Sequence, residues 1–356
     1  MSEEQIDEAK AEAFADRFVG IIAGASLALM TSVGDRTGLF DAMAGLSPST
    51  SAEIAQAAGL NERYVREWLG AMVVGEIVEY DAANQTYRLP PEHAAFLTTA
   101  AGPDNLAYFT QYFPVLGNVE DEVVEAFRKG GGVPYSSYPK FQELQAGETS
   151  RVFDATLVDV TMPLVPGLVE RLESGIEAAD VGTGAGHAVN VLAKAFPNSR
   201  FVGYDFSDEG VAAGRAEAAE WGLTNATFEV KDVTDIAERE RFELITAFDA
   251  IHDQREPRAV LRNIEQALKP DGTFLMVDIA ASSKLEENVG NPWAPLFYTW
   301  STLHCMTVSL ALGGEGLGTA WGEQKARELL TEAGFTRIEA ERVEDDPINV
   351  YFVAQK

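Results

Sequence analysis

The segment Glu177–Asp205 reads E-A-A-D-V-G-T-G-A-G-H-A-V-N-V-L-A-K-A-F-P-N-S-R-F-V-G-Y-D. Its apolar runs and glycines predict a buried strand that ends at Val181, a glycine-rich turn, a helix over about His187 to Phe196, and a second strand that ends at Asp205. Strand, helix and strand in this order are the repeating unit of an α/β fold with a parallel sheet.

The turn in this segment lets a ligand come close to the backbone. Gly182, Gly184 and Gly186 alternate through it, and glycine has no Cβ in the way. The helix that follows points free N–H groups back into the turn, which favours an anionic ligand group. Asp205 lies nineteen residues after Gly186, where a carboxylate can accept both hydroxyls of a ribose. The segment therefore predicts a nucleoside-binding turn; an ordinary tight strand-to-helix turn is the alternative.

The spacing of the glycines separates two classes of nucleoside-binding protein. A dinucleotide fingerprint needs G-x-G-x-x-G, but the sixth position here is His187. The pattern from Asp180 onward is D-x-G-x-G-x-G, which resembles motif I of the class I S-adenosylmethionine (SAM) methyltransferases. The spacing disfavours the alternative of an NAD-linked Rossmann oxidoreductase.

Length and composition limit the function classes. The chain has 356 residues, so we expect two domains, or one domain with a large cap. The formal net charge of −29 disfavours nucleic acid as the main ligand, because phosphate binding needs clustered Lys and Arg. One cysteine, Cys305, excludes an internal disulfide, and four scattered histidines show no metal-ligand spacing. We expect a metal-free site and a cytoplasmic protein.

The N-terminal region carries no sign of export or membrane insertion. The start, M-S-E-E-Q-I-D-E-A-K, is acidic where a secretory signal would be basic. The stretch Val19–Val33 is apolar but too short to span a bilayer, and Gly20 and Gly24 interrupt it. It predicts a buried helix or a helix at a dimer interface, with no membrane association.

Residues 1–100 predict a winged-helix domain. Thr50 and Glu53 form a candidate capping box, Gly59 is a helix stop, and Asn61 caps the next helix. That helix carries apolar residues at helical spacing: Val65, Trp68, Leu69 and Met72. The sequences E-I-V-E-Y, D-A-A-N-Q and T-Y-R-L then predict a strand, a turn and a second strand. Two helices followed by a hairpin are typical of a winged helix.

The charge of this domain argues against DNA binding. Residues 1–100 hold six Lys and Arg against fifteen Asp and Glu. The second helix offers Arg63 and Arg66, but also Glu62 and Glu67, which would repel phosphates. The region resembles the winged-helix domain that many small-molecule methyltransferases use for dimerisation and as a substrate cap, so we expect a homodimer.

Residues 101–172 are expected to form a helical linker and substrate cap. Aromatic residues cluster at its start: Tyr108, Phe109, Tyr112 and Phe113. They predict either the core of a domain interface or a lid over the substrate, and Tyr112 is a candidate substrate contact. The stretch Gly130–Pro139, G-G-G-V-P-Y-S-S-Y-P, predicts a flexible connection.

Residues 173–356 contain further strands whose ends carry polar residues. Asp232 follows the strand A-T-F-E-V and is a candidate acceptor for the adenine amine, with the Val233 N–H reaching a ring nitrogen. A loop residue or a helix cap is the other interpretation of Asp232. The strand F-E-L-I-T-A-F precedes His252, and L-K-P-D-G-T-F-L-M-V-D ends at Asp278. In open parallel sheets ligands lie at the carboxyl ends of strands, where these residues are all expected.

These motifs together resemble a class I SAM-dependent methyltransferase over residues 177–356. Across its length the chain resembles bacterial, mycobacterial-type small-molecule methyltransferases with an N-terminal winged-helix domain. The resemblance implies a Rossmann-like, seven-stranded sheet and SAM as cofactor. It also implies the cofactor-binding residues Asp180, Gly182, Gly184, Gly186, Asp205, Phe206, Asp232, Val233 and Phe248.

Residues 284–322 are an insertion rich in large apolar residues and glycine. In this fold a segment between the fifth and sixth strands lies over the ligand crevice, so Trp300, His304 and Met306 are candidate substrate contacts. Packing against the winged-helix domain is the competing interpretation.

Methyl transfer to a hydroxyl or thiol needs alignment of the acceptor and removal of its proton. His252 is the candidate base, because its usual pKa suits proton transfer near neutral pH. The pair His252-Asp253 also resembles the H-D of plant-type O-methyltransferases, in which the histidine is the base. The Trp that follows in those enzymes is Gln254 here. A histidine that only binds SAM or caps a helix is the alternative, and Asp278 is expected to orient His252 or to replace it.

The sequence as a whole predicts a SAM-dependent methyltransferase that acts on a small molecule, most readily at oxygen, with sulfur or nitrogen possible. The alternative from a different class is a SAM-sensing winged-helix regulator that binds DNA.

Overall fold

The computed structural model describes residues 6–356, and the chain divides into two compact units at residues 114 and 115. The acidic start, Met1–Gln5, lies outside the described residues. The elements of the first unit are α1 (Glu8–Arg36), α2 (Leu39–Ala44), α3 (Ser51–Ala58), α4 (Glu62–Val74), β1 (Glu79–Asp81), β2 (Thr86–Arg88), α5 (Pro91–Leu97) and α6 (Leu106–Phe109). Helix α7 (Tyr112–Gly117) contains the division.

The winged-helix elements form as the sequence predicts. The Thr50 side chain and Glu53 make both bonds of the capping box of α3, and Gly59 ends that helix in the left-handed conformation. Asn61 caps α4 by accepting a hydrogen bond from the Arg63 N–H. The strands β1 and β2 pair in an antiparallel hairpin. Buried side chains of α2, α3 and α4 form the core of this unit, with the Trp68 ring edge-on to Phe40 at 5.2 Å between centroids.

Helix α1 is longer than the sequence analysis expected. Its 29 residues include an apolar window of mean hydropathy 1.6. Among the described residues it is the one single helix that is long and apolar enough to cross a membrane, by length and composition alone. The apolar window of this helix therefore extends beyond the stretch Val19–Val33, which is itself too short to span a bilayer. The expectation of burial fails within the chain, because only 17% of this window is buried. Large apolar side chains between 41 and 65% exposed follow one another along it: Phe14, Phe18, Val19, Ile21, Ile22, Leu29 and Val33.

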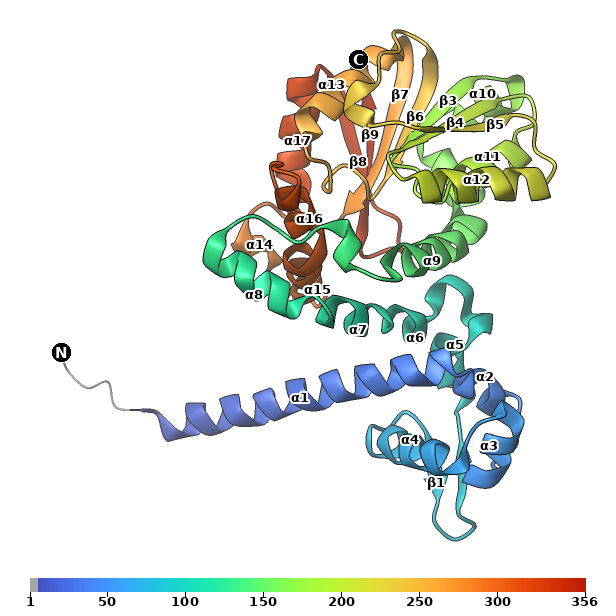
Figure 1. Ribbon diagram of the computed structural model, residues 1–356, viewed down its shortest axis with the longest axis vertical. Coiled ribbons are helices and arrows are strands. Elements are labelled where there is room, and N and C mark those ends of the chain that lie inside the picture. The colour runs from blue at the N-terminus through green and yellow to red at the C-terminus, as the bar shows by residue number, and fades with distance from the viewer. Residues whose placement is uncertain (1–5) are drawn as a thin grey trace. The chain divides into compact units, whose positions relative to one another are not determined.

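The second unit is a seven-stranded sheet with helices on both faces (Figure 1). Its strands are β3 (Glu177–Val181), β4 (Arg200–Asp205), β5 (Ala226–Val230), β6 (Phe242–Phe248), β7 (Leu268–Ile279), β8 (Arg337–Glu341) and β9 (Asn349–Gln355). Its helices are α8 (Glu120–Lys129), α9 (Phe141–Thr156), α10 (Leu168–Ser174), α11 (His187–Ala195), α12 (Asp208–Glu220), α13 (Pro257–Ala267), α14 (Leu285–Asn288), α15 (Ala294–Trp300), α16 (Met306–Ala311) and α17 (Gly322–Ala333).

The strand order is β5-β4-β3-β6-β7-β9-β8, in which β9 alone runs antiparallel to both of its neighbours. The chain moves outward from β3 through β4 to β5 and then returns to start β6 on the other side of β3. The neighbouring carboxyl ends of β3 and β6 are therefore a topological switch point, where ligands bind in open α/β sheets. This is the Rossmann-like, seven-stranded sheet that the motifs predicted.

Neighbouring residues of the central strands enter two different cores. In β3, Ala179 and Val181 join α13 and α17 in one core, while Ala178 joins α11 in the other. Helices α11 and α12 contact β4 and β5, and α13 contacts β7 and α17 (Figure 1). The sheet is therefore buried on both faces, which leaves its carboxyl edge as the accessible side for a ligand.

The stretch Gly130–Pro139, which the sequence analysis expected to be flexible, is held in place. The Val133 N–H donates to the Thr307 hydroxyl at 3.0 Å. A Cβ on Gly132 would overlap the Thr307 carbonyl oxygen, so only glycine lets the segment pack this closely on α16.

We predict that Gly186→Ala destabilises the protein more than Gly222→Ala does. Both glycines have positive φ, +76° and +69°, so alanine is strained at either position. A Cβ at Gly222 meets nothing within 4 Å, whereas one at Gly186 would overlap the Phe228 ring. We expect Gly186→Ala to lose about 1–3 kcal/mol more in free energy of unfolding, as measured by urea denaturation. Equal losses would contradict the packing argument.

Candidate active site

A hydrogen bond joins the glycine turn directly to Asp205. The Gly184 N–H donates to Asp205 Oδ2 at 2.8 Å, and the Ser207 N–H donates to Oδ1 at 2.9 Å. Burial raises the pKa of Asp205 against these hydrogen bonds, which favour the charged form. A Cβ built at Gly184 meets nothing within 4 Å, so the inner side of the turn is open. The turn thus combines open space, exposed backbone and an adjacent carboxylate.

Asp180 lies beneath the turn, where it is almost fully buried at the end of β3. It accepts a hydrogen bond from the Thr246 hydroxyl at 2.6 Å. Burial raises the pKa of Asp180 to about 6, although this hydrogen bond opposes the rise. Asp180 is therefore in position to support the turn from below.

Asp232 and Val233 follow β5 on the same edge of the sheet. The Asp232 side chain caps a short 3-10 turn, because Oδ1 accepts from the Thr234 N–H at 2.9 Å and from its hydroxyl at 2.6 Å. Partial burial tends to raise the pKa of Asp232, but the hydrogen bonds from Thr234 outweigh burial and lower this pKa. Val233 is buried. Asp232 is thus a cap, which was the other interpretation of this residue. The two hydrogen bonds to Oδ1 hold the carboxylate in place.

His252 lies at the centre of a buried polar cluster. Its Nδ1 is 2.8 Å from Asp278 Oδ1, and its Nε2 is 3.3 Å from Asp253 Oδ1. Burial alone would lower the pKa of His252, but the carboxylates of Asp278 and Asp253 outweigh it and raise the pKa well above 6.5. The resting ring is therefore an imidazolium held between two carboxylates.

Asp278 is fixed by three donors on one oxygen. Besides His252, the Trp321 indole N–H donates to its Oδ1 at 2.9 Å and the Ile279 N–H at 2.8 Å. The other oxygen, Oδ2, is buried and accepts no hydrogen bond from residues 6–356. Asp278 can therefore set the ring orientation of His252 without leaving its own position.

A third carboxyl, Asp249, closes the cluster on the Nδ1 side. Carboxylate oxygens of Asp249 and Asp278 and a ring nitrogen of His252 all lie within 4.8 Å of one another. Burial, with the charge of Asp278 added, raises the pKa of Asp249 to about 8. Asp249 also has φ +50°, an uncommon backbone conformation for a residue other than glycine.

Aromatic rings adjoin this cluster and reach the end of β4. The Tyr135 hydroxyl donates to Asp253 Oδ2 at 3.3 Å, and its ring lies 5.6 Å from Phe206 and 5.5 Å from His304. His304 stacks on Phe141 at 3.7 Å between centroids. Burial lowers the pKa of His304 to about 4, so this ring is neutral near pH 7. Phe206 is 55% exposed. The rings thus connect the predicted cofactor side to the polar cluster.

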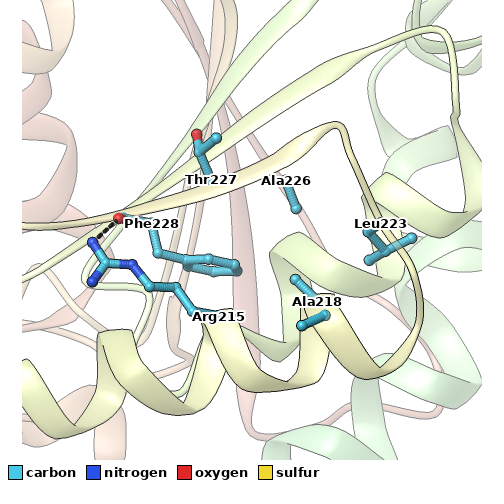
Figure 2. Close-up of a pocket in the computed structure, with 7 residues that line it drawn as sticks. Arg215, Ala218, Leu223, Ala226, Thr227 and Phe228 are labelled. Atoms are coloured by element: carbon cyan, nitrogen blue, oxygen red, sulfur yellow. Dashed lines mark hydrogen bonds between the residues drawn. The ribbon is translucent and has the colours of Figure 1, made fainter.

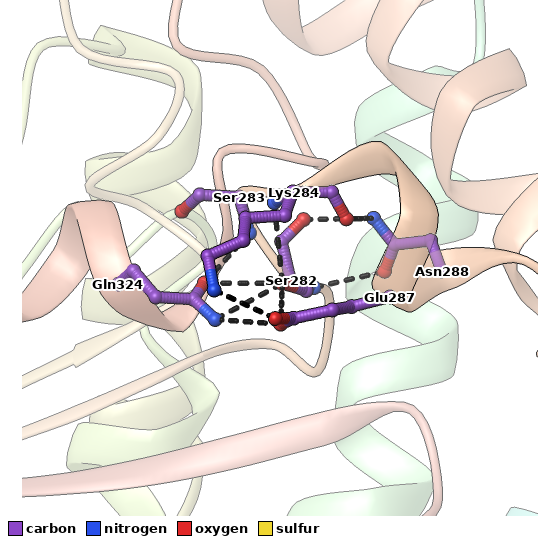
Figure 3. Close-up of polar contacts among 6 residues, drawn as sticks. All are labelled: Ser282, Ser283, Lys284, Glu287, Asn288 and Gln324. Carbon is purple, nitrogen blue, oxygen red and sulfur yellow. Dashed lines mark hydrogen bonds and ion pairs between the residues drawn. The ribbon is translucent and has the colours of Figure 1, made fainter.

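The insertion at residues 284–322 contacts the loop that carries His252. The Gly318 N–H donates to the His252 carbonyl at 3.4 Å, and the Ser309 hydroxyl donates to the Gln254 carbonyl at 2.9 Å. The start of the insertion is tied to α17 by a polar network drawn in Figure 3: Ser282, Ser283, Lys284, Glu287, Asn288 and Gln324. The Ser283 hydroxyl also donates to the Trp321 carbonyl at 2.6 Å. The network therefore helps to position the indole that holds Asp278.

Other predicted site residues lie farther from this cluster or in a different unit. Phe248 packs on Phe153 at 4.9 Å between ring centroids. Trp300 ends α15, and Met306 begins α16 next to the buried His304-Cys305 pair; both are half-buried. Tyr112 belongs to the first unit, where its ring lies 5.6 Å from Phe109.

Sequence reasoning missed three residues that complete the cluster. Trp321 and Tyr135 donate to its carboxylates, and Cys305 contributes a buried thiol within 4.8 Å of the ligand atoms of His252 and Asp253. The sequence offered only their positions as a sign of this role: Cys305 lies in the insertion, and Tyr135 follows the three glycines at residues 130–132.

A groove of about 350 Å³ lies elsewhere, between α12 and the edge strand β5 (Figure 2). Its lining residues are Arg215, Ala218, Ala219, Leu223, Ala226, Thr227 and Phe228. The Arg215 guanidinium donates to the Phe228 carbonyl at 2.6 Å. This bond occupies the one cation of the groove, whose lining contains no acid, base or nucleophile suited to proton transfer, so the polar cluster is the better candidate for chemistry.

Comparison with known families finds a match within each of the two units. Residues 25–99 match the Rv2258c-like winged HTH domain, and residues 172–339 match a family described as methyltransferase domain.

Solved structures show the same fold at low sequence identity. Human N-acetylserotonin methyltransferase in complex with SAM is 16% identical, with a TM-score of 0.70, 100% of this chain covered and 99% of that chain. The mitomycin 7-O-methyltransferase MmcR is 18% identical, with a TM-score of 0.70, 98% of this chain covered and 100% of that chain. The uncharacterized methyltransferase YcgJ of Bacillus subtilis is 32% identical over 100 residues, which are 28% of this chain and 39% of that protein. This chain therefore spans well under half the length of such curated relatives.

We predict that Asp249→Asn removes a pH dependence of stability. Because the pKa of Asp249 is raised in the folded state to about 8, that state binds more protons than the unfolded state between about pH 4 and pH 8. Wild-type stability should fall as pH rises through this window, and the neutral Asn variant should lack this loss. Asn also tolerates positive φ. Urea unfolding at pH 5 and pH 8 measures the difference; a variant that follows the wild type at both pH values would refute it.

Proposed function

We propose that this chain, which carries a methyltransferase domain behind an Rv2258c-like winged helix-turn-helix domain, transfers a methyl group from SAM to the oxygen of a small-molecule acceptor. The observation that carries the proposal is the buried His252–Asp278 pair on the same sheet edge as the glycine turn and Asp205. SAM supplies an electrophilic methyl group when it is bound.

The proposed cofactor residues lie along the ends of β3, β4 and β5. Asp205 is held beside the turn by the Gly184 N–H, which leaves its carboxylate where a ribose would meet it. The exposed ring of Phe206 offers a surface for adenine, and Asp232 with Val233 follows on the next strand. We assign Asp180, Gly182, Gly186 and Phe248 to the same site, as walls and support of the turn.

His252 is the proposed base, and Asp278 is its positioning residue. Nδ1 is committed to Asp278, so Nε2 is the nitrogen that can accept a proton. In the resting arrangement Nε2 faces Asp253. An acceptor hydroxyl must therefore replace Asp253 there, after the imidazolium has lost its proton to solvent. Nε2 would then take the hydroxyl proton, which would leave the acceptor oxygen free to receive the methyl group that SAM supplies.

The proposed acceptor is an apolar or aromatic molecule with a hydroxyl group. Tyr135, the stacked pair of Phe141 and His304, and the insertion surround the polar cluster with rings. We propose Tyr112, Trp300 and Met306 as further substrate contacts, within a helical cap over residues 101–172 and the cap insertion 284–322. Methylation of sulfur or nitrogen would use the same alignment.

Two other functions receive less support. A DNA-binding regulator would need a basic face, but α4 pairs Arg63 with Glu67 and Arg66 with Glu62. An NAD-linked oxidoreductase would need the G-x-G-x-x-G spacing that His187 breaks.

We further propose that the protein is a cytoplasmic homodimer that pairs through residues 1–100. The apolar stripe of α1 follows the helical repeat, with Phe14, Phe18, Ile22, Leu29 and Val33 on one face. A stripe this exposed marks a surface that is covered in use. Glu8 and Asp16 at the start of the helix and Arg17 in its first half are charges that a bilayer core disfavours.

We predict that His252→Ala abolishes methyl transfer but keeps cofactor binding. Loss of a general base costs about 10²–10⁴-fold in turnover, while calorimetry should still show about micromolar binding of S-adenosylhomocysteine, and none of NAD. His187→Gln is the matched control, because that histidine pairs with Glu217 and Asp154 instead. Wild-type turnover should rise with pH as the imidazolium loses its proton, above the usual pKa of histidine. Retained turnover on an oxygen acceptor would reject His252 as the base, and silence from S-adenosylhomocysteine would reject the cofactor.

We predict that the double variant Phe18→Asp, Ile22→Asp converts a dimer into a monomer, because two carboxylates within an apolar interface would lose their hydration. Light scattering after size-exclusion chromatography measures the mass. Val74→Asp changes an 83% exposed apolar residue of α4 and should leave the dimer intact. A monomeric wild-type protein would contradict the proposal.

A further inference from the structure

The Nε2 side of His252 carries a set of side chains that the proposed methyl transfer does not explain. A ring nitrogen of His252, a carboxylate oxygen of Asp253 and Sγ of Cys305 all lie within 4.8 Å of one another. Asp253 Oδ1 is buried, and apart from its ion-pair contact with His252 Nε2 it accepts no hydrogen bond within the described part of the chain. A methyltransferase base needs neither a thiol nor a carboxylate beside the nitrogen that accepts the proton, since proton transfer uses one lone pair.

The three donors match the ligands of a soft divalent cation. Zn²⁺ binds thiolate, imidazole and carboxylate together in tetrahedral sites, with ligand atoms about 3.5 Å apart. His252 Nε2 and Asp253 Oδ1 lie 3.3 Å apart. The chain brings the ligands from two segments: His252 and Asp253 come from the loop after β6, and Cys305 ends the π-helical segment Ser301–Cys305 that joins α15 to α16. Hard cations such as Mg²⁺ avoid thiolate, so the thiol selects for Zn²⁺ or Co²⁺.

Charge and lone pairs in the surroundings also favour a cation. Three carboxyl groups, Asp249, Asp253 and Asp278, surround one imidazole. Next to Cys305, His304 presents Nδ1 at 3.6 Å from the sulfur, while its buried Nε2 has no hydrogen-bond partner among residues 6–356. Buried polar atoms without partners are costly in a folded protein. A bound cation would satisfy Asp253 and offset the excess of negative charge.

We propose that His252, Asp253 and Cys305 form a binding site for Zn²⁺ or a similar thiophilic divalent cation, and that the bound cation inhibits methyl transfer. The cation takes the Nε2 lone pair in a coordinate bond, and the thiol proton and any proton on Nε2 pass to solvent. Three protein ligands leave the fourth position to water. With the Nε2 lone pair occupied, His252 cannot accept the proton of an acceptor, so occupancy and base catalysis exclude each other. The inhibitory half rests on the proposed function; the binding half does not.

The experiment is a titration of the full chain with Co²⁺, followed by absorption spectroscopy. Because Cys305 is the one cysteine of the chain, any thiolate-to-cobalt charge-transfer band in the near ultraviolet reports this site alone. We expect the band to saturate at one equivalent together with the visible bands of tetrahedral cobalt, and to be displaced by Zn²⁺. Cys305→Ser should lose the band, and Asp253→Asn should weaken Co²⁺ binding by about tenfold or more.

Two controls keep the result interpretable. His187→Gln removes a histidine that lies between two carboxylates but has no thiol, and it should keep the full band. The far-ultraviolet circular dichroism and the urea unfolding midpoint of each variant show whether the fold is intact, whatever its cofactor binding or activity. No charge-transfer band with the wild type would overturn the site even if methyl transfer is established.

Inhibition is then tested on methyl transfer with and without Zn²⁺. We expect Zn²⁺ to lower turnover by more than about tenfold at saturation, EDTA to restore it, and Cys305→Ser to need at least about tenfold more Zn²⁺. Activation by Zn²⁺, or inhibition unchanged in Cys305→Ser, would overturn the inhibitory role. If no acceptor is methylated at all, the proposed function fails, while the cobalt spectrum still decides the binding site.

Discussion

The hydrogen-bonded ion pair between His252 and Asp278 joins more of the second unit than any other single contact of the site. Asp278 ends β7, and His252 lies in the loop after β6, so the pair forms only when these strands lie side by side in register, as Phe248 does with Val277. Removing one partner of a buried ion pair costs about 3–5 kcal/mol, because the other charge stays buried and unpaired. The Trp321 indole donates to the same carboxylate oxygen, which brings in the start of α17. Sheet, insertion and last helix therefore share one acceptor oxygen.

The two sides of the candidate site differ in the number and pairing of their charged groups. On the glycine side, backbone N–H groups meet the isolated carboxylate of Asp205, and the open space lies over the turn. On the His252 side, carboxylates outnumber the cation, and burial forces Asp249 toward its neutral form. An acidic edge of this kind suits a cofactor with a cationic sulfonium centre, and it disfavours acceptors that carry a carboxylate of their own. The charges of the site and the glycine pattern thus both favour SAM as the ligand.

Local sequence patterns predicted those features that depend on neighbours in the chain. The capping box of Thr50 and Glu53 and the left-handed stop at Gly59 need only a few residues, and both form as predicted. The strand ends at Asp205 and Asp278 were predictable too, because parallel strands bring their carboxyl ends to one edge. Trp321, Tyr135 and Cys305 were not, since Trp321 and Cys305 reach the cluster from the insertion and Tyr135 reaches it from the linker, and no periodicity encodes the paths of these segments. Helix α1 is a further example of a feature that local sequence cannot predict. Its apolar pattern indicated a helix, but not which surface packs against its apolar side chains.

The proposed base and the proposed cation site share one atom, Nε2 of His252. Nδ1 is fixed by Asp278, so every exchange at His252 takes place at the other nitrogen. Asp253 holds that nitrogen in the resting state, and Asp253 is itself held by the Tyr135 hydroxyl. Because the Tyr135 ring also lies against Phe206 and His304, movement at either the cofactor side or the aromatic wall alters the hold on Asp253. In the resting imidazolium the Nε2 lone pair carries the proton that faces Asp253. Once that proton is lost, the lone pair can accept the proton of an acceptor hydroxyl or bind a cation, but not both at a time.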